Sequence, residues 1–156
     1  MTNKNVFKRR LLKLADLLQK LPRKRFDYGR WVGDDWKGKT DLACGTTACA
    51  FGWATTIPAL RKAGLRLVES TNGPRLFTVS IKGGSTSEHE APKLAAREIF
   101  GLENDEFEYL FIPDSGITFP ELGLPREGPT HQATAKQVAK HIRQFVKAKY
   151  NRVKAR

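Results

Sequence analysis

The stretch that decides the fold is CGTTACAFGWA, residues 44–54. From Thr46 to Thr56 the chain is apolar on nearly every side of a helical wheel, which is typical of a buried helix. Its small residues allow neighbouring elements to approach the helix axis, and Phe51 and Trp53 fill the wider spaces. The pattern therefore predicts a short central helix around which the rest of the chain packs.

Amphipathic helices are expected on both sides of this segment. Apolar residues recur at steps of three and four over residues 4–21. A second such run follows Thr134, whose hydroxyl forms a capping-box spacing with Gln137. Shorter helices are expected over residues 58–64, 92–100 and 104–111.

The remaining segments predict one hairpin and one long loop. Residues 65–81 alternate apolar and polar side chains about the turn signal TNGP, which predicts a β-hairpin lying against helices. Residues 112–132 hold four of the eight prolines and three glycines, so this segment is either a functional loop or a mobile insertion. A chain of 156 residues has the length of one domain, 1–156. We predict an α+β fold, predominantly helical, with about five helices around a central Cys-Gly-Thr helix.

Positive charge is concentrated at the two ends of the chain. The formal net charge is +12. Residues 1–40 hold 12 Lys and Arg against 4 Asp and Glu, residues 136–156 hold 8 against none, and residues 41–135 hold 8 against 12. Basic ends on a mildly acidic middle are typical of a protein that meets polyanions, although a solvated basic face has the same signature.

The basic ends supply the candidate binding residues. In the last helix the cations recur at steps of four and three, so they form one row, which a disordered basic tail would lack. A second basic group lies on the first helix and just after it. The predicted nucleic-acid-binding residues are Lys13, Arg23, Lys24, Arg25, Lys140, Arg143 and Lys147.

The two cysteines, Cys44 and Cys49, allow several interpretations. A sulfur at the start of a helix is stabilised as a thiolate, which makes Cys44 the candidate catalytic nucleophile. The rest of a papain-type signature is missing, and the candidate bases are His131 in a loop and His141 in a basic helix. Helix positions five apart point about 140° away from each other, which disfavours a disulfide. Packing of inert thiols explains more of the residues.

The sequence predicts no cofactor and no metal. Two cysteines and three scattered histidines do not supply the ligands of a zinc site, and neither a glycine-rich phosphate loop nor a paired acidic motif is found. No apolar run approaches the length of a membrane span. We expect a cytoplasmic protein with reduced thiols and no membrane partner.

Several segments together resemble a known family. FDYGRW, CGTTACAFGWA, IPAL, GLRL, AAREIFGLENDEFEYLF and TAKQVAKHIRQF cover residues 26–146 in patches. They are similar to small uncharacterised proteins of phages and bacteria with a Phe-Asp-x-x-x-Trp, Cys-Gly-Thr-x-x-Cys-x-x-Gly-Trp-Ala, Phe-Gly-Leu and Leu-Phe order. The resemblance implies a shared fold and a phage or prophage origin, and it brings no activity. The basic helices are not among the matched features, so polyanion binding rests on this sequence alone.

These observations favour a small intracellular binding protein over an enzyme. The leading hypothesis is contact with nucleic acid or another polyanion through the basic first and last helices, mainly at phosphates. Two alternatives stay open. One is a phage-type adaptor or inhibitor that binds an acidic host protein or a phosphorylated small molecule, and the other is a thiol enzyme that uses Cys44.

Overall fold

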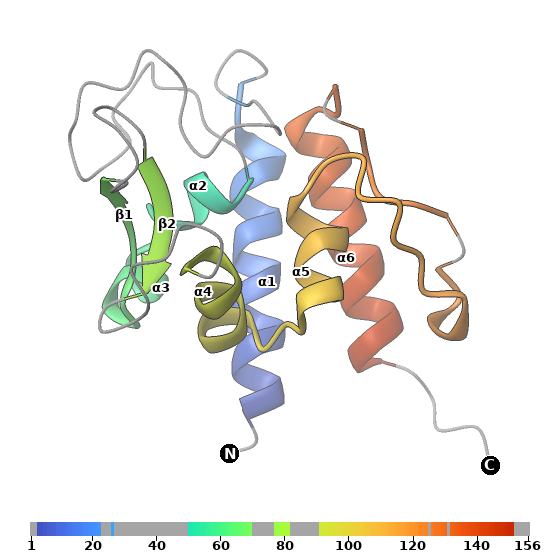
Figure 1. The fold of residues 1–156 in the computed structure, drawn as a ribbon, viewed down its shortest axis with the longest axis horizontal. Helices are drawn as coiled ribbons and strands as arrows, with labels where there is room; N and C mark the ends of the chain where they lie inside the picture. The colour runs from blue at the N-terminus through green and yellow to red at the C-terminus, as the bar shows by residue number, and fades with distance from the viewer. Residues whose placement is uncertain are drawn as a thin grey trace.

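Helices make up most of the structure (Figure 1). The computed structural model describes residues 3–22, 26, 50–69, 77–81, 91–124, 126–130 and 132–151. The elements in chain order are α1 (Asn3–Lys20), α2 (Ala50–Ala54), α3 (Pro58–Lys62), β1 (Leu65–Glu69), β2 (Phe77–Ile81), α4 (Ala91–Phe100), α5 (Asn104–Phe111), the 3-10 helix η2 (Pro120–Leu122) and α6 (Ala135–Tyr150). No helix within these ranges is both long and apolar enough to cross a membrane.

The first and last helices form an antiparallel pair (Figure 1). Lys8 Nζ donates a hydrogen bond of 2.7 Å to Oδ1 of Asn151, which follows the end of α6. Farther along α1, Arg143 of α6 pairs with Asp16 at 2.9 Å. The predicted apolar stripe of α1 is confirmed, because four of its side chains have no exposed surface: Leu11, Leu14, Ala15 and Leu18. The two basic helices are therefore neighbours in the fold.

Helix α2 lies in the core, as the sequence predicts for the second half of the central helix. All five of its residues are buried, and the Phe51 ring stacks on Phe111 with ring centres 4.8 Å apart. Phe51 also lies 5.9 Å from the rings of both Phe100 and Phe107. Helices α2, α4 and α5 thus share one aromatic cluster. The Cys-Gly-Thr part of the predicted helix lies outside the described residues, so its central position stays a prediction.

The two strands lie at the opposite side of the molecule from α6 (Figure 1). β1 pairs antiparallel with β2, in a register that places Leu65 opposite Ile81 and Glu69 opposite Phe77. The pair is covered by helices, because β1 contacts α3 and β2 contacts α4. Both strands fall within the range 65–81 for which the sequence predicts a hairpin, and the connecting turn lies outside the described residues.

The connection from α4 to α5 is made by a glycine in the left-handed conformation. Gly101 has φ +64°, and Leu102 N–H donates to the carbonyl of Ala96, so the helix end is closed as the sequence predicts. Phe7 of α1 packs so closely on Gly101 that an added Cβ would overlap its ring. The next helix begins at Asn104, as expected, but its capping residue is Glu103.

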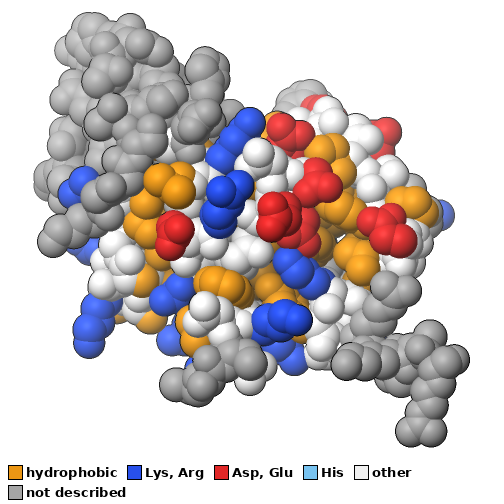
Figure 2. Space-filling model, turned by 60° about the horizontal axis from the view of Figure 1, so that its bottom comes forward, with side chains coloured by type: hydrophobic (Ala, Val, Ile, Leu, Met, Phe, Trp, Pro, Cys, Tyr) orange, Lys and Arg blue, Asp and Glu red, His pale blue; other side chains and the backbone are white. Residues whose placement is uncertain are grey.

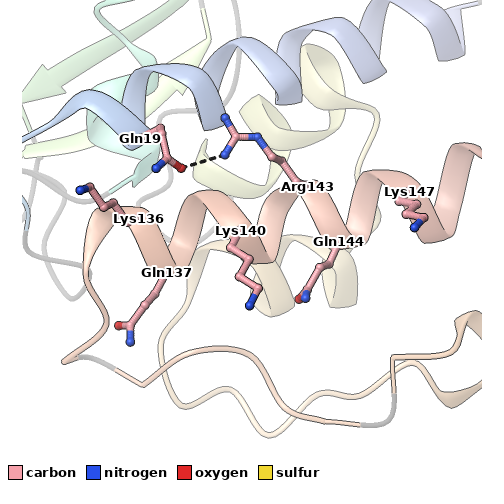
Figure 3. A pocket seen from close by; sticks show the side chains of 7 residues that line it. All are labelled: Gln19, Lys136, Gln137, Lys140, Arg143, Gln144 and Lys147. Atoms are coloured by element: carbon pink, nitrogen blue, oxygen red, sulfur yellow. Dashed lines mark hydrogen bonds between the residues drawn. The ribbon is translucent and has the colours of Figure 1, made fainter.

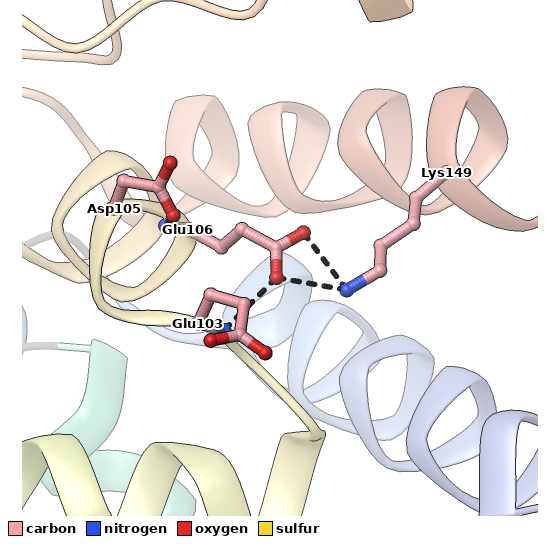
Figure 4. A network of polar contacts seen from close by, with 4 residues as sticks. All are labelled: Glu103, Asp105, Glu106 and Lys149. Atoms are coloured by element: carbon pink, nitrogen blue, oxygen red, sulfur yellow. Dashed lines mark hydrogen bonds and ion pairs between the residues drawn. The ribbon is translucent and has the colours of Figure 1, made fainter.

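A buried ion pair fastens α5 to α6 (Figure 4). The Glu106 carboxylate accepts from the N–H of Glu103 at 2.9 Å and pairs with Lys149 Nζ at 2.8 Å. The Glu106 side chain is only 11% exposed, so the ammonium group compensates a charge that water hardly reaches. Burial, with the nearby Glu106 carboxylate, raises the pKa of Tyr150 to about 12. The end of α6 is thereby held against the start of α5.

The predicted long loop lies along α6 (Figure 1). We call residues 112–130 the strap, with Pro125 outside the described residues. Its two limbs meet where the N–H of Asp114 donates to the carbonyl of Pro129. Phe119 is buried, with its ring 5.1 Å from Tyr109 and 6.3 Å from Phe145. This apolar anchor fixes the strap against α5 and α6.

Candidate anion-binding groove

A groove lined by cations runs along α6 (Figure 3). It has a volume of about 550 Å³. We call it the lysine groove. It is lined by four cations and three amides: Lys136, Lys140, Arg143, Lys147, Gln19, Gln137 and Gln144. No carboxylate is among the side chains that line it.

The sequence places the four cations on one side of α6. At about 100° per residue, positions 136, 140, 143 and 147 fall within roughly 60° of each other around the helix axis. The opposite side holds the buried apolar residues Val138, Ile142 and Phe145. The capping box of Thr134 and Gln137 is formed as predicted and fixes where the helix begins. The row is therefore a consequence of the amphipathic pattern of α6.

Three of the four cations are free to bind an anion. Lys136, Lys140 and Lys147 are exposed, and none of them pairs with an acidic side chain in the part of the chain that the structure describes. The like charges of these neighbouring ammonium groups repel each other. A bound polyanion would neutralise them and relieve this repulsion. The row thus presents uncompensated positive charge.

Arg143 lines the groove and also contacts α1. Its guanidinium donates to Asp16 and to Gln19, each at 2.9 Å, and its side chain is 38% exposed. Both partners lie on α1, so Arg143 joins the two basic helices while it lines the groove. Its predicted part in binding stays a prediction, and its contacts with Asp16 and Gln19 give it a structural part as well.

Of the other predicted binding residues, the structure describes only Lys13. Lys13 is exposed on α1, about one helical turn before Asp16, and it does not line the lysine groove. Arg23, Lys24 and Arg25 lie outside the described residues, as do Cys44, Cys49 and His131. The structure thus brings Lys140, Arg143 and Lys147 together and leaves the predictions on the second basic group as predictions.

His141 faces the core rather than the groove that holds the cations. Its Nε2 atom lies 3.0 Å from the carbonyl oxygen of Tyr109, which can only accept, so Nε2 carries the hydrogen. Burial lowers the pKa of His141, and the bond to this carbonyl opposes that shift. The ring is therefore neutral near pH 7 and adds no cation to the row.

Acidic side chains gather away from the lysine groove. Exposed acids on and between α4 and α5 include Glu98, Glu103 and Asp105. Figure 2 looks at the end of the molecule that is lowest in Figure 1, and it shows Asp and Glu side chains gathered in the right half of that face. The charge asymmetry read from the sequence is thus a spatial asymmetry as well, with an acidic area on one face and the basic row on α6.

Four groove residues were not among the predicted binding residues: Gln19, Lys136, Gln137 and Gln144. Gln137 was predicted only as part of the capping box. Lys136 belongs to the same row and precedes Lys140 by four positions, so its spacing already marked it. Gln144 follows Lys140 by four positions and is exposed. Gln19 comes from α1, and only the packing of α1 on α6 brings it to the groove.

Comparisons with known proteins add no assignment. No family model matches the chain, and neither a curated protein nor a solved structure matches it. Within the described ranges, no group of three or more His, Cys, Asp or Glu side chains is arranged to hold a metal ion. The geometry of the lysine groove is therefore the basis for a functional proposal.

Proposed function

We propose that this protein binds nucleic acid, or a polyanion of similar charge density, through the lysine groove of α6 and the neighbouring cations of α1. The observation that carries the proposal is the row of Lys136, Lys140 and Lys147, which is exposed, in phase and unpaired among the described residues. We propose a binding protein and not an enzyme.

The length of the row suits a phosphate backbone. Lys136 and Lys147 are eleven residues apart, or roughly 16 Å at 1.5 Å per residue. One strand of a duplex carries a phosphate about every 3.4 Å along the axis, so the row covers the length of about five phosphates. Lysine binds phosphate as a point charge and does not read bases. The contact is therefore expected to depend strongly on salt and weakly on sequence.

The α1 cations extend the proposed surface. Lys13 is exposed on the helix that lies beside α6, and Arg23, Lys24 and Arg25 follow the end of that helix in the sequence. In the proposed surface Lys13 adds positive charge on the helix next to α6.

The test is a charge-removal variant with a matched control. In the first variant Lys136, Lys140 and Lys147 are all replaced by glutamine, and Arg143 is kept because its loss would also remove the contacts with Asp16 and Gln19 on α1. The control variant replaces three exposed cations on other elements, Lys62→Gln, Arg66→Gln and Arg97→Gln. Both variants lose the same formal charge, so a general effect of net charge is common to them.

Binding is measured with short labelled duplex and single-stranded oligonucleotides over a series of salt concentrations. Each phosphate contact contributes about 0.9 to the slope of log affinity against log salt on duplex and about 0.7 on a single strand. The groove variant is expected to bind weakly, with the slope reduced by about 2 to 3. Equal losses in the groove variant and the control would contradict the assignment to this groove.

A further inference from the structure

A second hollow lies beside the lysine groove, between the strap and the last two turns of α6. Its volume is about 660 Å³, within the range of roughly 300–1,000 Å³ that ligand pockets occupy. We call it the strap groove. Leu122 and Leu124 of the strap and Ala148 of α6 form its apolar lining. It lies above the buried contact of Tyr109 with His141, so its floor is fixed by the core.

The position of the strap is set by close packing at Gly128. A Cβ at this residue would lie 2.7 Å from the carbonyl oxygen of Tyr109 and 3.2 Å from Nε2 of His141. The strap therefore approaches α5 and α6 more closely than any residue with a side chain allows. Phe119, which is buried against Tyr109 and Phe145, holds the strap at an earlier point. The strap groove is thus a defined surface between two anchored points.

The rim of the strap groove carries two amides, Gln144 and Asn151, beside the charged side chains of Arg126, Glu127 and Lys147. Gln144 is exposed and makes no hydrogen bond to the described residues. Asn151 accepts from Lys8 through Oδ1, which leaves its NH₂ group as a free donor. An apolar lining with amide donors and acceptors at the edge suits a flat group with polar edge atoms. A nucleobase has this chemistry.

The strap groove and the lysine groove are continuous. Gln144 and Lys147 line both of them, and Lys140 precedes Gln144 by one helical turn. A strand whose phosphates lie on Lys140 and Lys147 therefore has its attached bases next to the strap groove. On the strap side the charges of Arg126 and Glu127 offset each other, whereas Lys140 and Lys147 on α6 are exposed cations, so the backbone is expected on the α6 side.

We infer that the strap groove accepts an unpaired base of a single-stranded nucleic acid, while the lysine groove holds the phosphates. This inference rests on the proposed function and names its substrate class. A base in a duplex is stacked and paired, and it enters such a groove only after unpairing, which costs free energy. The protein therefore prefers a single strand to a duplex of the same length at equal salt.

The experiment fills the strap groove without changing charge. Ala148→Leu puts a larger side chain on the groove lining and keeps a good helix former in α6. Ala59→Leu, at an exposed position of α3, is the matched control. Gln144→Ala is a second variant, which removes the rim amide and leaves the groove open. The probes are labelled single-stranded and duplex oligonucleotides of one length, and circular dichroism confirms that each variant is folded.

The expected result is a roughly tenfold loss of affinity for the single strand in Ala148→Leu, which is the effect of losing about one base contact. Duplex affinity and the salt slope stay as in the wild type, and Gln144→Ala weakens single-strand binding less. The inference is overturned if single-strand affinity is unchanged in both variants, or if the wild type binds duplex more tightly. In either case salt-dependent binding through the lysine groove still supports the proposed function. An absence of binding to both probes overturns the two together.

Discussion

Replacing Gly128 by alanine tests whether the strap is held by close packing against α5 and α6. The added Cβ would lie 2.7 Å from the carbonyl oxygen of Tyr109, whereas ordinary contact begins near 3.4 Å, so the strap has to move by about 0.7 Å. The group it meets is backbone, and His141 behind it is buried, so neither gives way easily. Overpacking of this kind costs about 1–3 kcal/mol.

The assay is urea unfolding of the wild type and the variant, with tryptophan fluorescence as the signal that monitors the transition. Thr130→Ala serves as the control, because the side chain of this exposed strap residue accepts only one long hydrogen bond, of 3.3 Å, from the N–H of Gln132. Its expected effect is within about 0.5 kcal/mol. A Gly128→Ala variant as stable as the wild type within that margin would refute the close packing of the strap.

Three further predictions concern the contacts that hold the helices together. Gly101→Ala is expected to lose about 2 kcal/mol, because alanine is strained at φ +64° and overlaps Phe7, and denaturant unfolding that shows less than 0.5 kcal/mol would contradict this packing. Because burial lowers the pKa of His141 in the folded state, the unfolded chain binds more protons on acidification, so stability falls as the pH drops below about 6.5. His141→Gln should flatten this part of the stability profile measured between pH 7 and pH 5, and an unchanged profile would exclude His141 as its source. Lys149→Met leaves the Glu106 carboxylate buried without its partner and is expected to cost about 1–3 kcal/mol in thermal unfolding, whereas a neutral effect would show that water already solvates that carboxylate.

Local signals in the sequence predicted most of the helices. The stripe of α1 and the capping box at Thr134 depend on residues three or four apart, which lie together whatever the rest of the chain does. Gly64 and Gly101 both take positive φ where the sequence predicts helix ends. The cap of α5 was harder to predict, because Glu103 is an unusual capping residue and its role depends on the reciprocal bond from Glu106.

The candidate site was less predictable because it depends on contacts between distant segments. The row on α6 follows from its own spacing, but Gln19 reaches the lysine groove only because α1 packs against α6. The same packing pairs Arg143 with Asp16, a contact that the spacing within α6 does not predict. The strap shows the limit most clearly, since its lack of periodicity gave no indication that it would lie against α6 and line a groove there.

The central claim is that the lysine row on α6 binds a phosphate backbone. Its most direct test is the affinity of the full chain for labelled oligonucleotides over a series of salt concentrations. Three unpaired lysines predict that log affinity falls with log salt at a slope of about −2 or steeper, and that the Lys136, Lys140 and Lys147 to glutamine variant loses most of this dependence. An affinity that is absent at low salt, or that changes little with salt, would contradict the claim.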